Sequence, residues 1–261
     1  MAHNQLFSRD EGSRDAPVVV LLHSLATHGE LWALQQSVWS ACFRVLSIDL
    51  PGHGRSSHVR GDDSLEDMAA QVLGTLDSRG VARASFVGVS LGGMVAQAIA
   101  LNRPDRVESL VLAHCGARTE NAVKTIWDQR IKQVEDEGMS AQVQSTLARW
   151  FPREFATSSP MTLQWVAEMI RHTPIEGYVS AIRAIQALDH LDRIHLIKVP
   201  TLVVAGDEDI AVTPGMASTL AHGIAGSELM ILEGAGHLGN VQTPHLFSER
   251  VGNFISCHLI T

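Results

Sequence analysis

The chain has 261 residues, 45% of them hydrophobic, which suits one α/β domain that carries an insertion. Its formal net charge is -8 and no run is rich in lysine and arginine, so nucleic acid is not an expected partner. No signal peptide or apolar membrane span is recognisable, and the three widely spaced cysteines fit a reducing compartment, so we expect a cytoplasmic protein that does not enter a membrane.

Short apolar runs along the chain have the composition of buried β-strands. They span residues 18–22, 43–48, 85–87, 109–113, 201–205 and 228–232. Most of these runs are apolar at nearly every position, which is typical of strands in a sheet that is covered on both faces.

A helix is predicted between the second and third of these strands, where apolar residues recur at helical spacing from Leu65 to Leu76. Ser64 and Asp67 form the pattern of an N-terminal cap, and Gly80 supplies a stop signal. Helices that alternate with buried strands predict an α/β fold, with a mostly parallel sheet, right-handed crossovers and helices on both faces.

The alternation stops between residues 119 and 196, where helical patterns follow one another without a convincing strand. An insertion between two parallel strands would lie over the C-terminal edge of the sheet, where ligands bind in open α/β folds. We therefore predict a core made of residues 1–118 and 197–261 and a helical cap, or lid, made of residues 119–196. The alternative is a helical decoration with no part in a binding site.

The most informative motif is the run from Gly88 to Gly92, Gly-Val-Ser-Leu-Gly, between the third strand and a helical pattern. Glycines two residues to either side of Ser90 allow a very tight strand-to-helix turn, which would expose the serine hydroxyl at the edge of the sheet. The run also fits an ordinary connection, because glycine and serine are common in turns.

A serine hydroxyl becomes a nucleophile only when a base takes its proton and a carboxylate orients that base. His237 follows the last predicted strand, and Asp209 follows the strand before it. Loops that leave parallel strands converge on one edge of the sheet, so Ser90, Asp209 and His237 can meet there. Asp207 is the alternative carboxylate, because spacing alone does not separate it from Asp209.

These motifs, with His23-Ser24-Leu25 and the turn from Asp49 to Ser56, resemble the α/β-hydrolase superfamily over essentially the whole chain. The order serine, aspartate, histidine is also the order of that superfamily. Residues 102–107, 127–131, 146–151 and 176–178 are similar to motifs of 3-oxoadipate enol-lactonases.

The resemblance implies a serine hydrolase that cleaves a small ester or lactone through an acyl-enzyme, as in aromatic catabolism, without a cofactor or metal. It places the acid three residues after Gly206, at Asp209. It also implies that the backbone amides of Leu25 and Leu91 bind the oxyanion.

The same resemblance implies pocket roles for residues of the cap. Trp127, Arg130 and Trp150 match the lactonase motifs, so they are expected to line the acyl pocket, and Arg130 would offer a cation to a substrate carboxylate. The alternative is that the tryptophans pack in the cap and Arg130 is solvated. Among other histidines, we expect His23 and His53 to bond to the backbone and His114 to lie at the pocket rim.

The chain departs from enol-lactonases at Pro51, where they often carry an arginine, and at residues 179–183. A generic carboxylesterase, a homoserine-lactone hydrolase, a cofactor-free haloperoxidase and a carbon–carbon bond hydrolase therefore stay open as alternatives. Outside enzymes, the same scaffold could serve as a small-molecule receptor, although a receptor would be expected to lose a member of the triad. The sequence predicts no oligomeric state.

Overall fold

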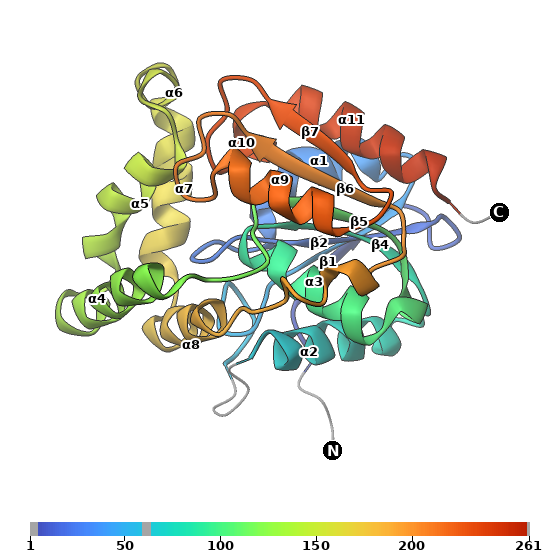
Figure 1. Cartoon of the computed structure of the whole chain (residues 1–261), viewed down its shortest axis with the longest axis horizontal. Helices are drawn as coiled ribbons and strands as arrows, with labels where there is room; N and C mark the ends of the chain where they lie inside the picture. Colours follow the sequence, from blue (N-terminus) through green and yellow to red (C-terminus); the bar gives the residue numbers. More distant parts are fainter. Residues whose placement is uncertain (1–4, 59–63, 260–261) are drawn as a thin grey trace.

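The computed structural model describes residues 5–58 and 64–259 (Figure 1). Residues 1–4, 59–63 and 260–261, which fall within the predicted core ranges, lie outside the described residues. Seven strands form one sheet in the order β1-β3-β2-β4-β5-β6-β7. Their bounds are β1 Ser8–Glu11, β2 Val18–Leu22, β3 Arg44–Ile48, β4 Ala84–Val89, β5 Val107–Ala113, β6 Thr201–Gly206 and β7 Glu228–Leu232.

Only the pairing of β1 with β3 is antiparallel among the described strands, and all other pairs are parallel. This confirms the predicted, mostly parallel sheet. The sequence did not predict β1, because its residues Ser-Arg-Asp-Glu contain no apolar side chain. The last strand, β7, is exposed at Glu228, Leu229 and Ile231, because it forms the edge of the sheet.

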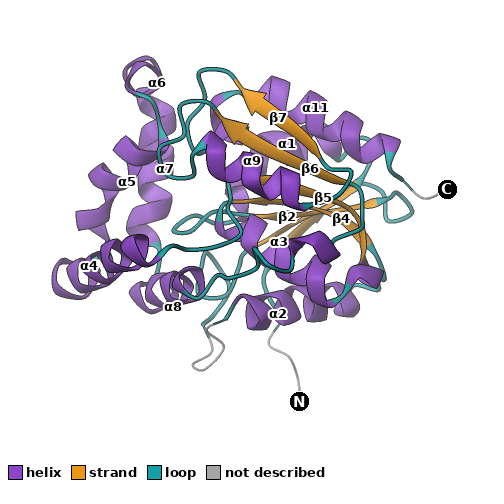
Figure 2. Cartoon of the chain, viewed as in Figure 1, coloured by secondary structure: helices purple, strands orange, loops and turns teal. Residues whose placement is uncertain are grey.

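Helices cover both faces of the sheet, as predicted (Figure 2). One face carries α1 and α11, which contact each other, and the other face carries α2, α3 and α9. The core helices are α1 Ala33–Trp39, α2 Leu65–Ser78, α3 Leu91–Asn102, α9 Pro214–Gly223, α10 Gly239–Gln242 and α11 Pro244–Cys257. Short 3-10 helices span Gly29–Trp32, Pro104–Arg106, Met139–Gln142 and Ile194–Leu196.

The predicted cap of α2 is present. The Ser64 side chain accepts a hydrogen bond from the Asp67 amide at 3.0 Å, and the Asp67 side chain accepts one from the Ser64 amide. The helix α3 follows β4 and is buried on all sides from Leu91 to Ala100. It is therefore a rigid support for Ser90, the residue that precedes it. None of the helices within residues 5–58 and 64–259 is both long and apolar enough for a membrane span.

Five helices follow one another between β5 and β6, in the segment predicted to be a cap. They are α4 Asn121–Glu137, α5 Val143–Trp150, α6 Arg153–Ser158, α7 Pro160–His172 and α8 Ile175–Gln186. In Figure 1 they lie together beyond the arrowheads of β6 and β7, at the C-terminal edge of the sheet. They therefore lie over the edge from which the loops with Ser90, Asp209 and His237 leave.

Candidate active site

Ser90 occupies the turn between β4 and α3 in an unusual backbone conformation, with φ 54° and ψ -115°. Non-glycine residues rarely adopt a positive φ, and such strain is typical of functional turns. The Ser90 amide donates a hydrogen bond to the Ala113 carbonyl at 2.8 Å. A Cβ on Gly88 would lie 2.3 Å from the Gly92 carbonyl carbon, and one on Gly92 would lie 2.1 Å from the Leu22 oxygen, so the turn requires both glycines.

A cavity of about 290 Å³ lies between the sheet edge and the cap, and both Ser90 and His237 line it. Residues of the helical segment between β5 and β6 form the other side of the cavity. The cap side chains of the wall include Val123, Trp127, Arg130, Thr146, Arg149, Trp150 and Tyr178.

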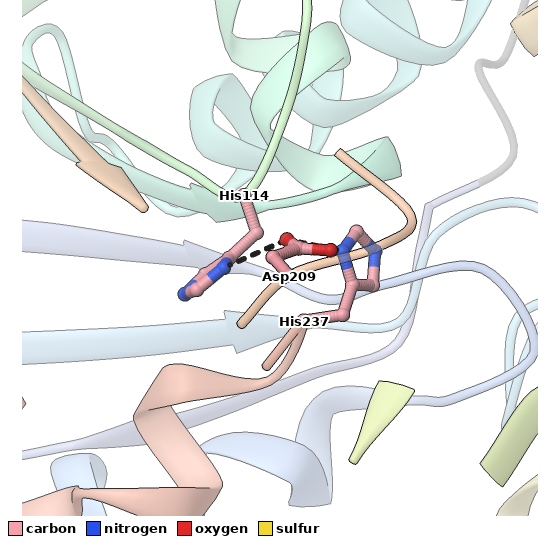
Figure 3. A group of neighbouring side chains, drawn as sticks. All are labelled: His114, Asp209 and His237. Carbon is pink, nitrogen blue, oxygen red and sulfur yellow. Dashed lines mark hydrogen bonds and ion pairs between the residues drawn. The ribbon is translucent and has the colours of Figure 1, made fainter. Parts of the chain in front are cut away.

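His237 and Asp209 form the buried polar pair of this site (Figure 3). His237 Nδ1 lies 2.9 Å from Asp209 Oδ2. The other carboxylate oxygen, Oδ1, accepts hydrogen bonds from the amides of Ala211 at 2.8 Å and Val212 at 2.9 Å. Asp207, the alternative carboxylate, is exposed to solvent, so the structure brings Asp209 rather than Asp207 against the histidine.

The surroundings of Asp209 favour its ionised form. Burial by itself raises the pKa of the carboxyl group, but the charge of His237 and the hydrogen bonds from His114 and His237 together hold that pKa well below its usual range. A carboxylate is therefore available to orient the imidazole.

Ser90 and His237 share the cavity but are not hydrogen-bonded to each other. Within residues 5–58 and 64–259, no hydrogen bond joins the Ser90 hydroxyl to the His237 ring. Because Nδ1 of His237 faces Asp209, Nε2 is the ring nitrogen left to meet the hydroxyl.

The cap contacts His237 directly through Trp150. The His237 amide donates a hydrogen bond to the Trp150 carbonyl at 2.7 Å, and the two rings stack with centroids 6.0 Å apart. Trp150 is buried and lines the cavity, so it combines both roles that the sequence left open for it.

Two arginines of the cap reach the cavity. Arg130 lies with its guanidinium carbon 5.3 Å from the centroid of the Trp127 ring, and both residues line the cavity. Arg149 lines the same wall, and burial together with the charge of Arg130 lowers its pKa. Neither guanidinium forms an ion pair with any described residue. Arg118 also lines the cavity, but it is paired with two aspartates.

The two amides predicted to bind the oxyanion belong to Leu25 and Leu91. Leu25 lines the cavity, and Leu91 is the first residue of α3, directly after the serine. Among the described residues, neither amide donates a hydrogen bond to the protein. Both amides therefore remain available as donors.

The structure shows the positions of three other histidines for which the sequence predicted a role: His23, His53 and His114. His23 accepts a hydrogen bond from the Leu50 amide at 2.8 Å, and His53 Nδ1 lies 3.0 Å from the Pro51 oxygen, as expected for structural histidines. The expectation for His114 was wrong. Its side chain is fully buried and does not line the cavity, because the ring is held between the Asp209 carboxylate and the Gly239 amide.

His114, Asp209 and His237 also place ligand-type atoms within 4.8 Å of one another, as a metal site would. The hydrogen bonds of these three residues fit histidines that carry a proton on Nδ1, rather than histidines that bind a metal ion through Nδ1. Nε2 of His114 accepts the Gly239 amide at 3.2 Å, so it carries no proton, whereas metal binding at Nδ1 of a neutral ring would leave Nε2 protonated.

The sequence profile described as the alpha/beta hydrolase fold matches residues 17–244. The chain belongs to the α/β-hydrolase family. The hydrolase is 29% identical to a 3-oxoadipate enol-lactonase of Acinetobacter baylyi over 240 residues, which cover 92% of this chain and 89% of the relative. It is 30% identical over 245 residues to a Pseudomonas syringae pv. syringae protein provisionally named carbamate hydrolase RutD, covering 93% of this chain and 95% of the relative.

A solved structure shows the same similarity to enol-lactonases. The crystal structure of the enol-lactonase from Burkholderia xenovorans LB400 matches the hydrolase with a TM-score of 0.92 and 36% identity, over 96% of each chain. These similarities confirm the resemblance to α/β-hydrolases and to enol-lactonases that the motifs predicted.

Two residues of the hydrolase's site were missed or misplaced by the sequence analysis. Arg149 could have been found from helical spacing, because Thr146 lies three residues before it and lines the same wall. His114 could not have been assigned in this way, because its ring is held by Asp209 and the Gly239 amide, two partners that are distant along the chain.

Proposed function

We propose that this hydrolase cleaves a small carboxylic ester or lactone through an acyl-enzyme on Ser90, and that its favoured substrate is an enol-lactone that carries a carboxylate. The observation that carries the proposal is the 2.9 Å hydrogen bond between His237 and Asp209, beside a cavity that Ser90 and His237 both line. A nucleophile, a base and an orienting carboxylate are the groups that acyl transfer requires.

In the proposed reaction, His237 Nε2 takes the hydroxyl proton of Ser90 while Oγ bonds to the substrate carbonyl carbon. The bond from that carbon to the leaving oxygen then breaks, and His237 returns the proton to this oxygen. In an enol-lactone the leaving group is an enol of the same molecule, which becomes a ketone. Water, deprotonated by His237, attacks the acyl-enzyme and releases the carboxylic acid and the serine.

This chemistry requires the Ser90 hydroxyl and the His237 ring to come within hydrogen-bond distance. Catalytic hydrogen bonds commonly tighten only when the substrate is bound. Trp150 supports the required position of His237, because it holds the histidine backbone and stacks on the ring. Asp209 supports the tautomer, because its carboxylate accepts a hydrogen bond from the Nδ1–H group.

The developing oxyanion would be bound by the amides of Leu25 and Leu91. Their lack of other hydrogen bonds among the described residues supports this assignment. Each such donor commonly contributes about 3 kcal/mol to transition-state stabilisation.

The cap side of the cavity supports an anionic substrate. Arg130 and Arg149 bring two guanidinium groups to a largely apolar wall that also includes Glu120 and the paired Arg118. Neither Arg130 nor Arg149 has a carboxylate partner among the described residues. The buried Nε1 of Trp127, also without a partner in the described part of the chain, adds a neutral donor. A carboxylate on the substrate would satisfy this set of donors. The similarity to enol-lactonases supports the same substrate class.

Carbamate hydrolysis is the second candidate, because a relative provisionally named for that reaction is 30% identical to this chain. Carbamates that lack a carboxylate would leave Arg130 and Arg149 without a role. A neutral carboxylesterase, a homoserine-lactone hydrolase and a carbon–carbon bond hydrolase would use the same triad and differ in the substrate alone.

The test compares two lactones with the same ring. One is 3-oxoadipate enol-lactone, and the other is α-angelica lactone, which carries a methyl group in place of the carboxymethyl group. We expect a higher kcat/KM for the carboxylated ring. Equal values, or faster hydrolysis of simple carbamates or neutral p-nitrophenyl esters, would contradict the proposed substrate, and a lack of turnover with every compound would favour the receptor alternative.

A further inference from the structure

His114 and His237 lie on opposite sides of the proposed acid, Asp209 (Figure 3), and His114 does not line the cavity. It is the first residue after β5, and its amide donates a hydrogen bond to the Val204 carbonyl of β6 at 2.8 Å. The side chain is completely buried, and the ring lies edge-on to the His237 ring with centroids 5.9 Å apart. The ring therefore cannot touch a substrate in the cavity.

The hydrogen bonds of this ring specify its protonation. Nε2 accepts a hydrogen bond from the Gly239 amide at 3.2 Å, so Nε2 carries no proton. Burial lowers the pKa of His114, which favours the neutral ring, whose single proton must then be on Nδ1. Nδ1 lies 3.2 Å from Asp209 Oδ2 and therefore donates to it. A Cβ on Gly239 would come within 2.6 Å of Nε2, so only glycine allows the ring to sit this close.

Asp209 consequently receives four hydrogen bonds, two on each oxygen. Oδ1 accepts the amides of Ala211 and Val212, and Oδ2 accepts one N–H from His237 and one from His114. The amides belong to the acid's own loop, whereas His114 directly follows β5 and links the carboxylate to the end of that strand. A buried carboxylate with every lone pair engaged is held in one orientation.

We propose that His114 is a positioning residue, whose Nδ1–H keeps the Asp209 carboxylate ionised and directed at His237. The inference rests on the proposed function, because it assigns His237 as the base that Asp209 orients. His114 acts only through Asp209 and makes no contact with the reacting atoms. Among the described residues, the charged or titratable groups that its ring faces are Asp209 and His237.

The test uses a matched pair of substitutions, His114→Leu and His114→Asn. Leucine and asparagine have the same branched shape, both remove the acceptor for the Gly239 amide, and only asparagine keeps an N–H at the place of Nδ1. We expect His114→Leu to lower kcat about tenfold or more with little change in KM, since one hydrogen bond to a charged group is lost outside the cavity. His114→Asn should recover most of that loss.

The pH profile gives a second readout. Without the His114 donor, more negative charge on Asp209 faces the His237 ring and stabilises its protonated form. The acidic limb of kcat/KM should therefore move to higher pH in His114→Leu and return towards its original position in His114→Asn. A merely structural role for His114 would lower the amount of folded enzyme without moving this limb.

A third readout does not depend on turnover. In the ¹⁵N-labelled full-length protein, NMR of the imidazole groups should show His114 protonated at Nδ1, with a second Nδ1–H from His237. The His237 signal should shift in His114→Leu and stay near its original position in His114→Asn. A proton on Nε2 of His114, or equal kcat and unmoved His237 signals in both variants, would overturn the inference. Failure of the proposed function is seen separately, as ester or lactone turnover retained in Ser90→Ala.

Discussion

The backbone amide of His237 donates a hydrogen bond to the Trp150 carbonyl at 2.7 Å, so the end of α5 in the cap holds the loop that carries the proposed base. Ring stacking between the same two residues adds a second contact. The helical segment between β5 and β6 thus does more than line the cavity, because it also holds one side of the proposed proton-transfer pair.

We therefore expect Trp150→Ala to lower kcat about tenfold or more, because the His237 ring loses the surface on which it stacks. Trp165→Ala is the matched control, since Trp165 also packs in the cap but does not line the cavity. Both variants should lose thermal stability. A similar fall in kcat for the two, measured on folded protein with a p-nitrophenyl ester, would show that Trp150 acts through general packing of the cap.

Replacing Arg130 or Arg149 with glutamine should raise KM for the carboxylated enol-lactone about tenfold, because each substitution removes a charge that faces the substrate carboxylate. The KM for α-angelica lactone should change little. Arg118→Gln serves as the control, since Arg118 lines the same cavity but is paired with Asp189 and Asp192. Equal changes of KM for both lactones would mean that the two arginines do not recognise a carboxylate.

Stability should fall as the pH drops from about 6.5 to about 4, partly because of buried histidines. Burial lowers the pKa of His53 to about 4 and lowers that of His23 as well. Between these pH values the unfolded chain binds a proton that the folded His53 ring does not, so acid favours unfolding. The slope for one such group is about 1.4 kcal/mol per pH unit.

The measurement is the free energy of unfolding in urea at several pH values between about 4.5 and about 7.5. His53→Asn, which keeps a donor for the Pro51 carbonyl, should show a shallower dependence than the original chain. His222→Asn, at an exposed position, should keep the pH dependence of the original chain. An unchanged slope in His53→Asn would contradict the assignment of a buried, neutral His53.

Most of the fold could be predicted from the sequence because buried parallel strands are apolar along their whole length. The strand β1 could not, since Ser8–Glu11 is polar and forms only because its backbone pairs with the edge of β3. In the site, Ser90 and His237 were predictable from glycine-flanked turns after strands. The separation of Asp209 from Asp207, and the place of His114, depend on which way single side chains turn, which spacing along the chain does not encode.

Covalent labelling tests the central claim, that Ser90 forms a bond to the substrate's acyl carbon, most directly. The full-length hydrolase is treated with diethyl 4-nitrophenyl phosphate, which phosphorylates activated serines, and the modified peptide is identified by mass spectrometry. We expect one diethylphosphoryl group on Ser90, loss of ester hydrolysis in proportion to labelling, and no label in Ser90→Ala. A label on another residue, or ester hydrolysis that continues after Ser90 is fully labelled, would contradict the claim.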